Sequence, residues 1–232
     1  MPSSLSSKIS LYNINFNISD KINEICESIL LFNKIHIFPY ENTISPGTGR
    51  IEFKNSEPEI VIGINMKYVK FTEQILSHEL LHFKLASDRN FIFGFDNNFN
   101  VIASLILSAF EHPLIIDIQK SIGINVFDFI KKDIDHNLSA LKNKIKSKNI
   151  TTKDLILWAD RFCWGVFPSK IKIAKQLIKS LHDTEFEVIN RITLEINSYK
   201  SNQDPQSLVS FIDTVFNFLD YDNNYEIKYI KE

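Results

Sequence analysis

The chain has 232 residues, of which 44% are apolar and 23% charged, and this composition excludes fibrous and low-complexity proteins. Lys and Arg number 26 against 28 Asp and Glu, so no global charge favours binding to nucleic acid or to an anionic membrane. Two cysteines do not make a disulfide scaffold, and the longest nearly apolar run, Val101 to Phe110, is about half of what a membrane-spanning helix needs. We therefore expect a cytoplasmic protein with a substantial core and with no membrane and no nucleic acid among its partners.

The amino-terminal part of the chain predicts an arm, one helix and a small sheet. Residues 1–18 alternate weakly between apolar and polar side chains, which indicates an N-terminal arm or an edge strand. A helix begins after Ser19, a good N-cap, and its apolar positions from Ile22 to Leu30 recur at helical spacing. Runs typical of strands follow at 35–38, 50–53 and 59–64 with breaker residues between them, which predicts a small antiparallel meander.

From residue 68 the pattern is helical almost to the end of the chain, and Gly123 and Gly165 stand where helix C-termini need them. The expected helices span 68–87, 97–111, 113–122, 125–147, 152–164, 169–182, 184–199 and 206–220. The predicted fold class is α+β. Residues 19–122 form a core with a small antiparallel or mixed sheet, and 123–232 form an all-helical extension or subdomain.

The segment Ile75-Leu-Ser-His-Glu-Leu-Leu-His-Phe83 carries the chemistry. His78 and His82 are four residues apart, so they lie on one face of a helix, where both imidazoles can bind a single Zn²⁺ ion. Glu79 lies about 100° around the helix from His78, where it flanks the metal and does not bind it. Zinc lowers the pKa of a water molecule, and a neighbouring carboxylate accepts the proton as the water attacks a carbonyl carbon.

This His-Glu-x-x-His segment resembles the active-site helix of the zincin metallopeptidases, which packs behind a small mixed sheet. The resemblance implies a zincin-like core with His78 and His82 as zinc ligands and Glu79 as the general base in the hydrolysis of peptide bonds. It also implies that a peptide or protein substrate binds as an added strand along an exposed strand of the sheet. Either Arg50–Phe53 or Glu59–Ile64 is expected to be that edge.

The third metal ligand distinguishes the zincin subgroups. Gluzincins take a Glu from a later helix, and Glu111, the only acidic residue of the apolar segment 98–113, fits that role. Because Pro113 disfavours a helical conformation at His112, Glu111 is expected in the last turn of its helix. Metzincins take a ligand six residues after the second His, which leaves Asp88 as an alternative, although Leu85 stands where they use Gly to turn the chain. His112 is a further alternative, either as a ligand or as the partner of one.

Two further questions stay open at this level. A zincin also needs a residue that stabilises the oxyanion, and the unranked candidates are Tyr68, His112, Arg161, His182 and Tyr199. The second question is the function. We expect a zinc metallopeptidase that is gluzincin-like, and the alternative is a catalytically silent protein with a zincin fold that regulates or binds a partner.

Overall fold

The computed structural model describes residues 9–12, 18–30, 32, 34–41, 46–54, 57–95, 100–180, 183–220 and 225–229. The chain divides into two compact units. The first unit comprises Met1–Phe93, Ile118–Val126 and Ile227–Glu232, and the second comprises Gly94–Asp117 and Phe127–Glu226. Within the expected N-terminal arm, Ile9–Leu11 forms a strand, whereas Ile14 and Phe16 lie outside the described residues.

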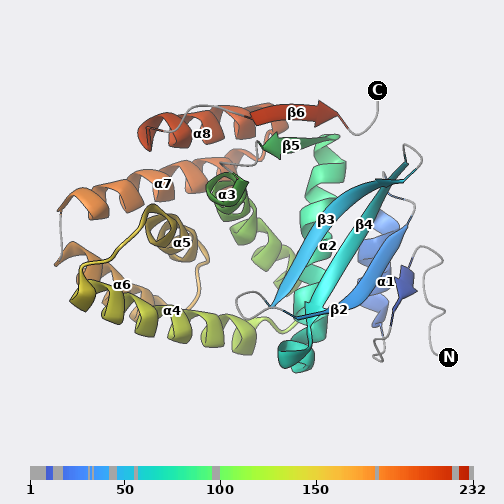
Figure 1. Ribbon diagram of the computed structural model, residues 1–232, viewed down its shortest axis with the longest axis horizontal. Helices are drawn as coiled ribbons and strands as arrows, with labels where there is room; N and C mark the ends of the chain where they lie inside the picture. Colours follow the sequence, from blue (N-terminus) through green and yellow to red (C-terminus); the bar gives the residue numbers. More distant parts are fainter. Residues whose placement is uncertain are drawn as a thin grey trace. The chain divides into compact units, whose positions relative to one another are not determined.

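The first unit is built on a four-stranded mixed sheet with the order β1-β2-β4-β3 (Figure 1). Its strands are β1 (Ile9–Leu11), β2 (Ile35–Tyr40), β3 (Gly47–Lys54) and β4 (Glu57–Asn65). β1, β2 and β4 run parallel, and only β3 is antiparallel to its neighbour β4. Of the two predicted alternatives, an antiparallel or a mixed sheet, the structure has the mixed one. The predicted antiparallel meander is wrong, because β4 lies between β2 and β3. The nearly continuous apolar run Ile60–Ile64 suits a central strand, since such a strand is buried on both faces.

Two helices cover one face of this sheet. α1 (Asp20–Ser28) and α2 (Thr72–Arg89) lie behind it in Figure 1, and the short 3₁₀ helix η1 (Met66–Phe71) joins β4 to α2. The predicted cap of α1 is confirmed, because the Ser19 hydroxyl accepts a hydrogen bond from the Ile22 N–H at 3.4 Å. Leu30 was expected in the buried stripe of this helix but is 75% exposed. The reason is that α1 ends at Ser28, so Leu30 does not continue the helical spacing.

The core of the first unit is aliphatic. Alternate residues of β2 and β4 face the helices, and five of these side chains are fully buried: Ile35, Ile37, Ile60, Ile62 and Ile64. Burying each of these side chains contributes about 1.5–3 kcal/mol to stability. This apolar packing holds the sheet and α2 together.

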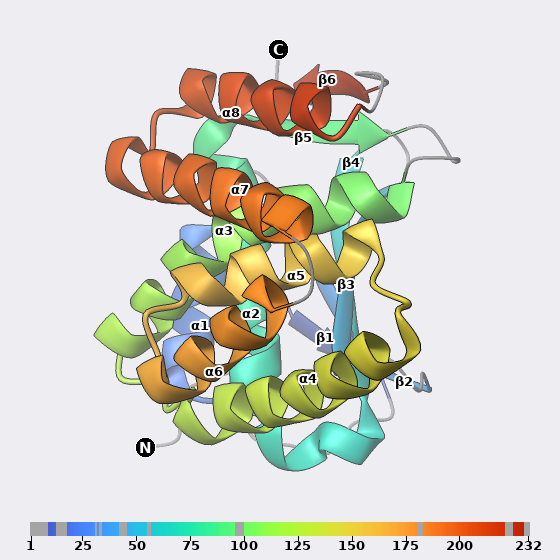
Figure 2. The ribbon, with the colours of Figure 1, turned by 90° about the vertical axis from the view of Figure 1, so that its left-hand side faces the viewer.

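The second unit is helical. Its elements are most of α3 (Asn100–Ser121), α4 (Phe127–Ser147), α5 (Thr152–Cys163), α6 (Pro168–Lys179), α7 (Asp183–Asn202) and α8 (Pro205–Phe218). α5 packs against α7, and α7 lies beside α8 (Figure 2). Two short strands that were not predicted, β5 (Phe91–Phe95) and β6 (Tyr225–Tyr229), pair as a separate sheet.

α3 is one helix where the sequence predicts two. Pro113 lies inside it, where the missing N–H removes only the hydrogen bond to the Ala109 carbonyl. Ile106, Phe110 and Ile115 of this helix are fully buried, and this packing outweighs the lost bond. The helix ends as predicted at Gly123, whose φ of 76° allows the Ile124 N–H to bond to the Gln119 carbonyl at 2.8 Å.

By length and hydropathy alone, residues Val101–Ser121 of α3 satisfy the requirement for a membrane-spanning helix, with a mean hydropathy of 1.7. The core helix of a globular protein passes the same test, and half of this stretch is buried inside the protein.

On the face of the sheet that turns away from α1 and α2, the Glu59 carboxylate joins β2 to β4. Glu59 is only 7% exposed, and its two oxygens lie 3.1 Å from Lys34 Nζ and 2.9 Å from His36 Nε2. The hydrogen bond from Lys34 lowers the pKa of Glu59, against the opposing effect of burial and together with the contribution of His36. A carboxylate whose pKa is lower in the folded state stabilises the protein above its unfolded pKa, and this stabilisation is lost as pH falls through the folded pKa.

We therefore expect the Glu59→Gln variant to melt at a lower temperature than the wild type at neutral pH. The difference should shrink at an acid pH at which the wild-type carboxylate is protonated as well. Thermal unfolding followed by circular dichroism at both pH values tests this. Glu52→Gln, which changes an exposed carboxylate on β3, is the control and should shift the midpoint little. If Glu59→Gln lowered the melting temperature equally at both pH values, the ion-pair assignment would be contradicted.

Candidate metal centre

α2 presents two imidazoles side by side. The helix is fixed to the core of the first unit by Ile75, Leu76, Leu80 and Leu81, which are at most 2% exposed. His78 and His82 lie one turn apart on the side of the helix away from Leu76 and Leu80, between the directions of Ile75 and Leu81, and both are half-buried. Their Nε2 atoms are 3.3 Å apart, and their rings are inclined at 80°.

This spacing has a direct chemical meaning. Two imidazole nitrogens bound at ~2.0–2.1 Å to one tetrahedral zinc ion lie roughly 3.3–3.4 Å from each other. The two Nε2 atoms of α2 therefore already stand at the separation that a shared metal requires. The alternative occupant of the same geometry is a single proton, shared as an N–H···N hydrogen bond between the two rings.

Glu79 leaves α2 in the direction of β3. Its carboxylate lies against the glycines at positions 47 and 49 of that strand, and the side chain is half-buried. The structure thus places a carboxylate next to the histidine pair in sequence but on a neighbouring part of the helix surface. The flanking role that the sequence predicts for Glu79 stays a prediction.

Asp88 does not join the histidine pair. α2 runs without a turn through Leu85 to Arg89, and Asp88 is an exposed residue whose two carboxylate oxygens each lie 3.0 Å from Lys84 Nζ. Six residues along a regular helix correspond to a rotation of about 240°, so Asp88 and His82 point in different directions. The metzincin-like alternative for the third ligand is therefore wrong.

In the second unit, Glu111 and His112 lie in the middle of α3. Glu111 was expected in the last turn of its helix, but α3 continues to Ser121, and Glu111 is only 2% exposed. His112 Nδ1 lies 2.8 Å from Asp160 Oδ2 on α5. Asp160 Oδ1 in turn accepts a hydrogen bond of 2.6 Å from the indole N–H of Trp164.

Asp160 is a site residue that the sequence did not reveal. It is 2% exposed and lies 48 positions from His112, so only the folding of α5 against α3 brings the two together. Burial alone would lower the pKa of His112, but the Asp160 carboxylate outweighs it and the pKa is raised. Because a carboxylate only accepts hydrogen bonds, Nδ1 carries a proton, and in the neutral ring the lone pair belongs to Nε2.

Other candidates from the sequence have different roles. Asp117, five residues after His112 on α3, is exposed and pairs with Lys200 at 2.6 Å. Arg161 is 5% exposed and donates to both carboxylate oxygens of Asp133, so it is committed to that ion pair. His182 lies outside the described residues. The residue that stabilises the oxyanion stays unassigned.

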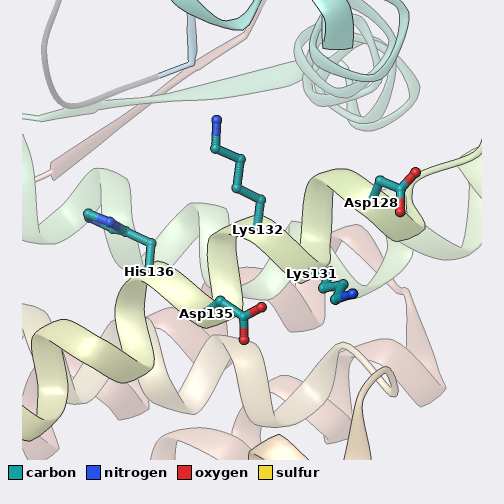
Figure 3. A pocket seen from close by; sticks show the side chains of 5 residues that line it. All are labelled: Asp128, Lys131, Lys132, Asp135 and His136. Atoms are coloured by element: carbon teal, nitrogen blue, oxygen red, sulfur yellow. The ribbon is translucent and has the colours of Figure 1, made fainter.

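A surface hollow of about 520 Å³ on α4 is lined by Asp128, Lys131, Lys132, Asp135 and His136 (Figure 3). All five side chains belong to one helix and spread outward from it in different directions, so they do not converge on a ligand (Figure 3). Asp135 is also paired with Lys170 of α6. The hollow is a solvated helix face.

Each unit thus gathers reactive side chains in one place. α2 offers two imidazoles with a flanking carboxylate, and α3 offers an imidazole that a buried carboxylate holds by its Nδ1. Comparison of the chain with protein-family models, with curated proteins and with solved structures finds no match. The function has to be inferred from the chain's own residues.

Proposed function

We propose that the protein is a zinc-dependent peptidase in which His78 and His82 bind the metal and Glu79 is the general base. The observation that carries this proposal is the 3.3 Å separation of the two imidazole nitrogens, with a carboxylate at the next position of the same helix. Neutral imidazole is a preferred zinc ligand, and two half-buried rings with adjacent Nε2 atoms suit a metal better than solvent. The proposed zincin-like arrangement, a mixed sheet with this helix against one face, supports the same conclusion.

We propose His112 as the third ligand and Asp160 as the residue that orients its ring. In this proposal His112 completes the ligand set with His78 and His82. Metal-binding histidines usually donate their other ring N–H to a carboxylate, and Asp160 accepts from His112 Nδ1 in this way. Glu111, the gluzincin-like ligand predicted from the sequence, is the competing candidate.

The course of α3 also favours His112 over Glu111. Gln119, near the end of this helix, donates hydrogen bonds to the Gln74 carbonyl at 2.9 Å and to the Ser77 hydroxyl at 2.6 Å, both on α2. His112 lies seven residues before Gln119 and therefore on the same face of α3, whereas Glu111 is rotated by about 100° from His112.

The proposed mechanism divides the work between the metal and Glu79. Bound zinc supplies the Lewis acidity that lowers the pKa of a water molecule. Glu79 accepts a proton from this water as it attacks the peptide carbonyl, and then donates the proton to the leaving amine. Both transfers need the carboxylate to be held in place, since proton transfer depends on hydrogen-bond distance.

The substrate is proposed to bind along β3. Of the two strands expected to form the edge, Glu59–Ile64 belongs to the central strand β4, so that expectation is wrong, whereas Arg50–Phe53 lies in β3 at the end of the strand order. The Asn65 N–H donates to the Pro46 carbonyl at 2.9 Å. The backbone N–H and C=O groups of the even-numbered residues of β3 therefore point to β4. Gly49 and Ile51 therefore direct their backbone N–H and C=O groups to the outer edge, where an extended peptide would add as a strand.

The Glu79→Gln variant should bind zinc like the wild type but lose hydrolysis, because an amide cannot accept the proton. The expected loss of kcat on an unfolded casein-like substrate is at least about 100-fold. Glu73→Gln, in the first turn of the same helix, is the matched control and should keep its activity. Full turnover in Glu79→Gln would show that the proposed base is wrong.

Purified protein should contain about one zinc per chain, and His82→Ala should lose it because two protein ligands hold zinc far less tightly than three. Elemental analysis of both proteins measures this, with His136→Ala on the exposed face of α4 as the control that retains the metal. A stably folded protein without metal would favour the catalytically silent binding protein. Zinc without proteolysis would favour a hydrolase acting on a substrate other than a peptide.

Zinc affinity should identify the third ligand. His112→Ala is expected to weaken binding strongly, and Asp160→Asn by about 10–100-fold, since it removes the acceptor that orients the ring. Competition with a chromophoric chelator gives the dissociation constants, and Asp117→Asn on the exposed side of α3 is the control. If Glu111→Gln weakens binding and His112→Ala does not, the gluzincin-like ligand set is correct instead.

A further inference from the structure

Two glycines of β3 lie on the sheet face that packs against α2. Gly47 pairs with Ile64 and Gly49 with Ile62, and both isoleucines point toward the helices. Residues directly opposite each other in an antiparallel pair share a face, so any side chain at position 47 or 49 would also point at α2.

The space that these side chains would occupy is already filled. A Cβ atom on Gly47 would lie 2.5 Å from Ile75 Cγ2 and 3.1 Å from Glu79 Oε1. A Cβ atom on Gly49 would lie 2.8 Å from Phe83 Cε2 and 3.0 Å from Glu79 Oε2. The two oxygens of the Glu79 carboxylate therefore lie against two successive glycines on the same face of one strand.

The backbone does not explain these glycines. Among the described residues, the glycines with a positive φ are Gly123 and Gly165, so Gly47 and Gly49 have conformations that any residue can adopt. Glycine within a strand also costs about 0.5–1 kcal/mol relative to alanine. The requirement at both positions is space on the side of α2, and Glu79 shares that space.

We propose that Gly47 and Gly49 are positioning residues that hold the Glu79 carboxylate in its working place; the catalytic meaning of that place rests on the proposed function. A methyl group at position 49 would push the carboxylate away from the strand by a few tenths of an ångström. Gly49 also directs its N–H and C=O to the outer edge of β3, where the substrate is proposed to bind. One residue thus sets the distance between the general base and the peptide.

The first test measures packing and does not depend on activity. In urea unfolding, Gly49→Ala should lower the midpoint of the wild type more than that of the Glu79→Ala variant, because part of the clash is with the Glu79 side chain. Gly63→Ala is the matched control. Its Cβ would meet Tyr40 Cβ at 2.9 Å on the opposite face of the sheet, so its effect should be equal in both backgrounds. Equal effects of Gly49→Ala in both backgrounds would overturn the proposal that the glycines position the Glu79 carboxylate.

The second test measures catalysis. Gly49→Ala should lower kcat by about 10–100-fold while zinc content and KM change little, since small displacements of a catalytic group have effects of this size. Glu79→Asp shortens the side chain and so makes room for the methyl group at position 49. The double variant should therefore lose less kcat than the product of the two single losses predicts. Unchanged kcat in a folded, zinc-loaded Gly49→Ala variant would overturn the positioning role. A further outcome is that the wild type fails to hydrolyse peptides while the urea experiment still shows that the effects of Gly49→Ala and Glu79→Ala depend on each other. That result would support the positioning of Glu79 by the glycines and refute the proposed function.

Discussion

The contact on which the proposed chemistry depends is the approach of His78 Nε2 and His82 Nε2 to 3.3 Å. A helix brings two residues into this relation only while it stays regular, and α2 is kept regular by the side that it buries. Leu76 and Leu80 are fully buried against the first unit's core, so the rotation of the helix about its axis is fixed. The buried leucines of α2 thereby fix the positions of His78 and His82 on the other side of the helix. The separation of the two Nε2 atoms thus depends on side chains that are not themselves proposed as ligands.

The sequence predicted the features that depend on neighbours along the chain. The pairing of His78 with His82, the cap at Ser19 and the helix end at Gly123 are all set within about one turn, so spacing and residue type suffice to find them. Features set by distant residues were missed. The order of β2, β3 and β4 depends on which apolar run occupies the centre, and the continuity of α3 through Pro113 depends on its buried side chains. Asp160 could not be assigned to His112 because nothing near either residue in the chain indicates the other.

Two adjacent buried charged residues of the second unit, Asp160 and Arg161, are each paired. The Asp160 carboxylate is satisfied by His112 and Trp164, while the neighbouring Arg161 is occupied by Asp133. A buried carboxylate needs such partners, because an unpaired charge in the interior costs several kcal/mol. Asp160 therefore fixes His112 strongly enough that the ring cannot turn to satisfy another acceptor through Nδ1. This leaves the other nitrogen with a defined direction, a property that a ligand requires and a purely space-filling histidine does not.

The glycines of β3 bear on the choice between an enzyme and a silent binding protein. A protein that only needed a stable contact between α2 and β3 would be more stable with alanine at both glycine positions and a smaller residue at position 79. These changes would remove two glycines from the strand and a partly buried carboxylate. The chain instead keeps both glycines and the carboxylate that lies against them. The local cost of two strand glycines falls at the place where the zinc peptidase hypothesis requires a base. Such a cost is expected at functional sites, so this arrangement favours the proposed enzyme over the silent binding protein.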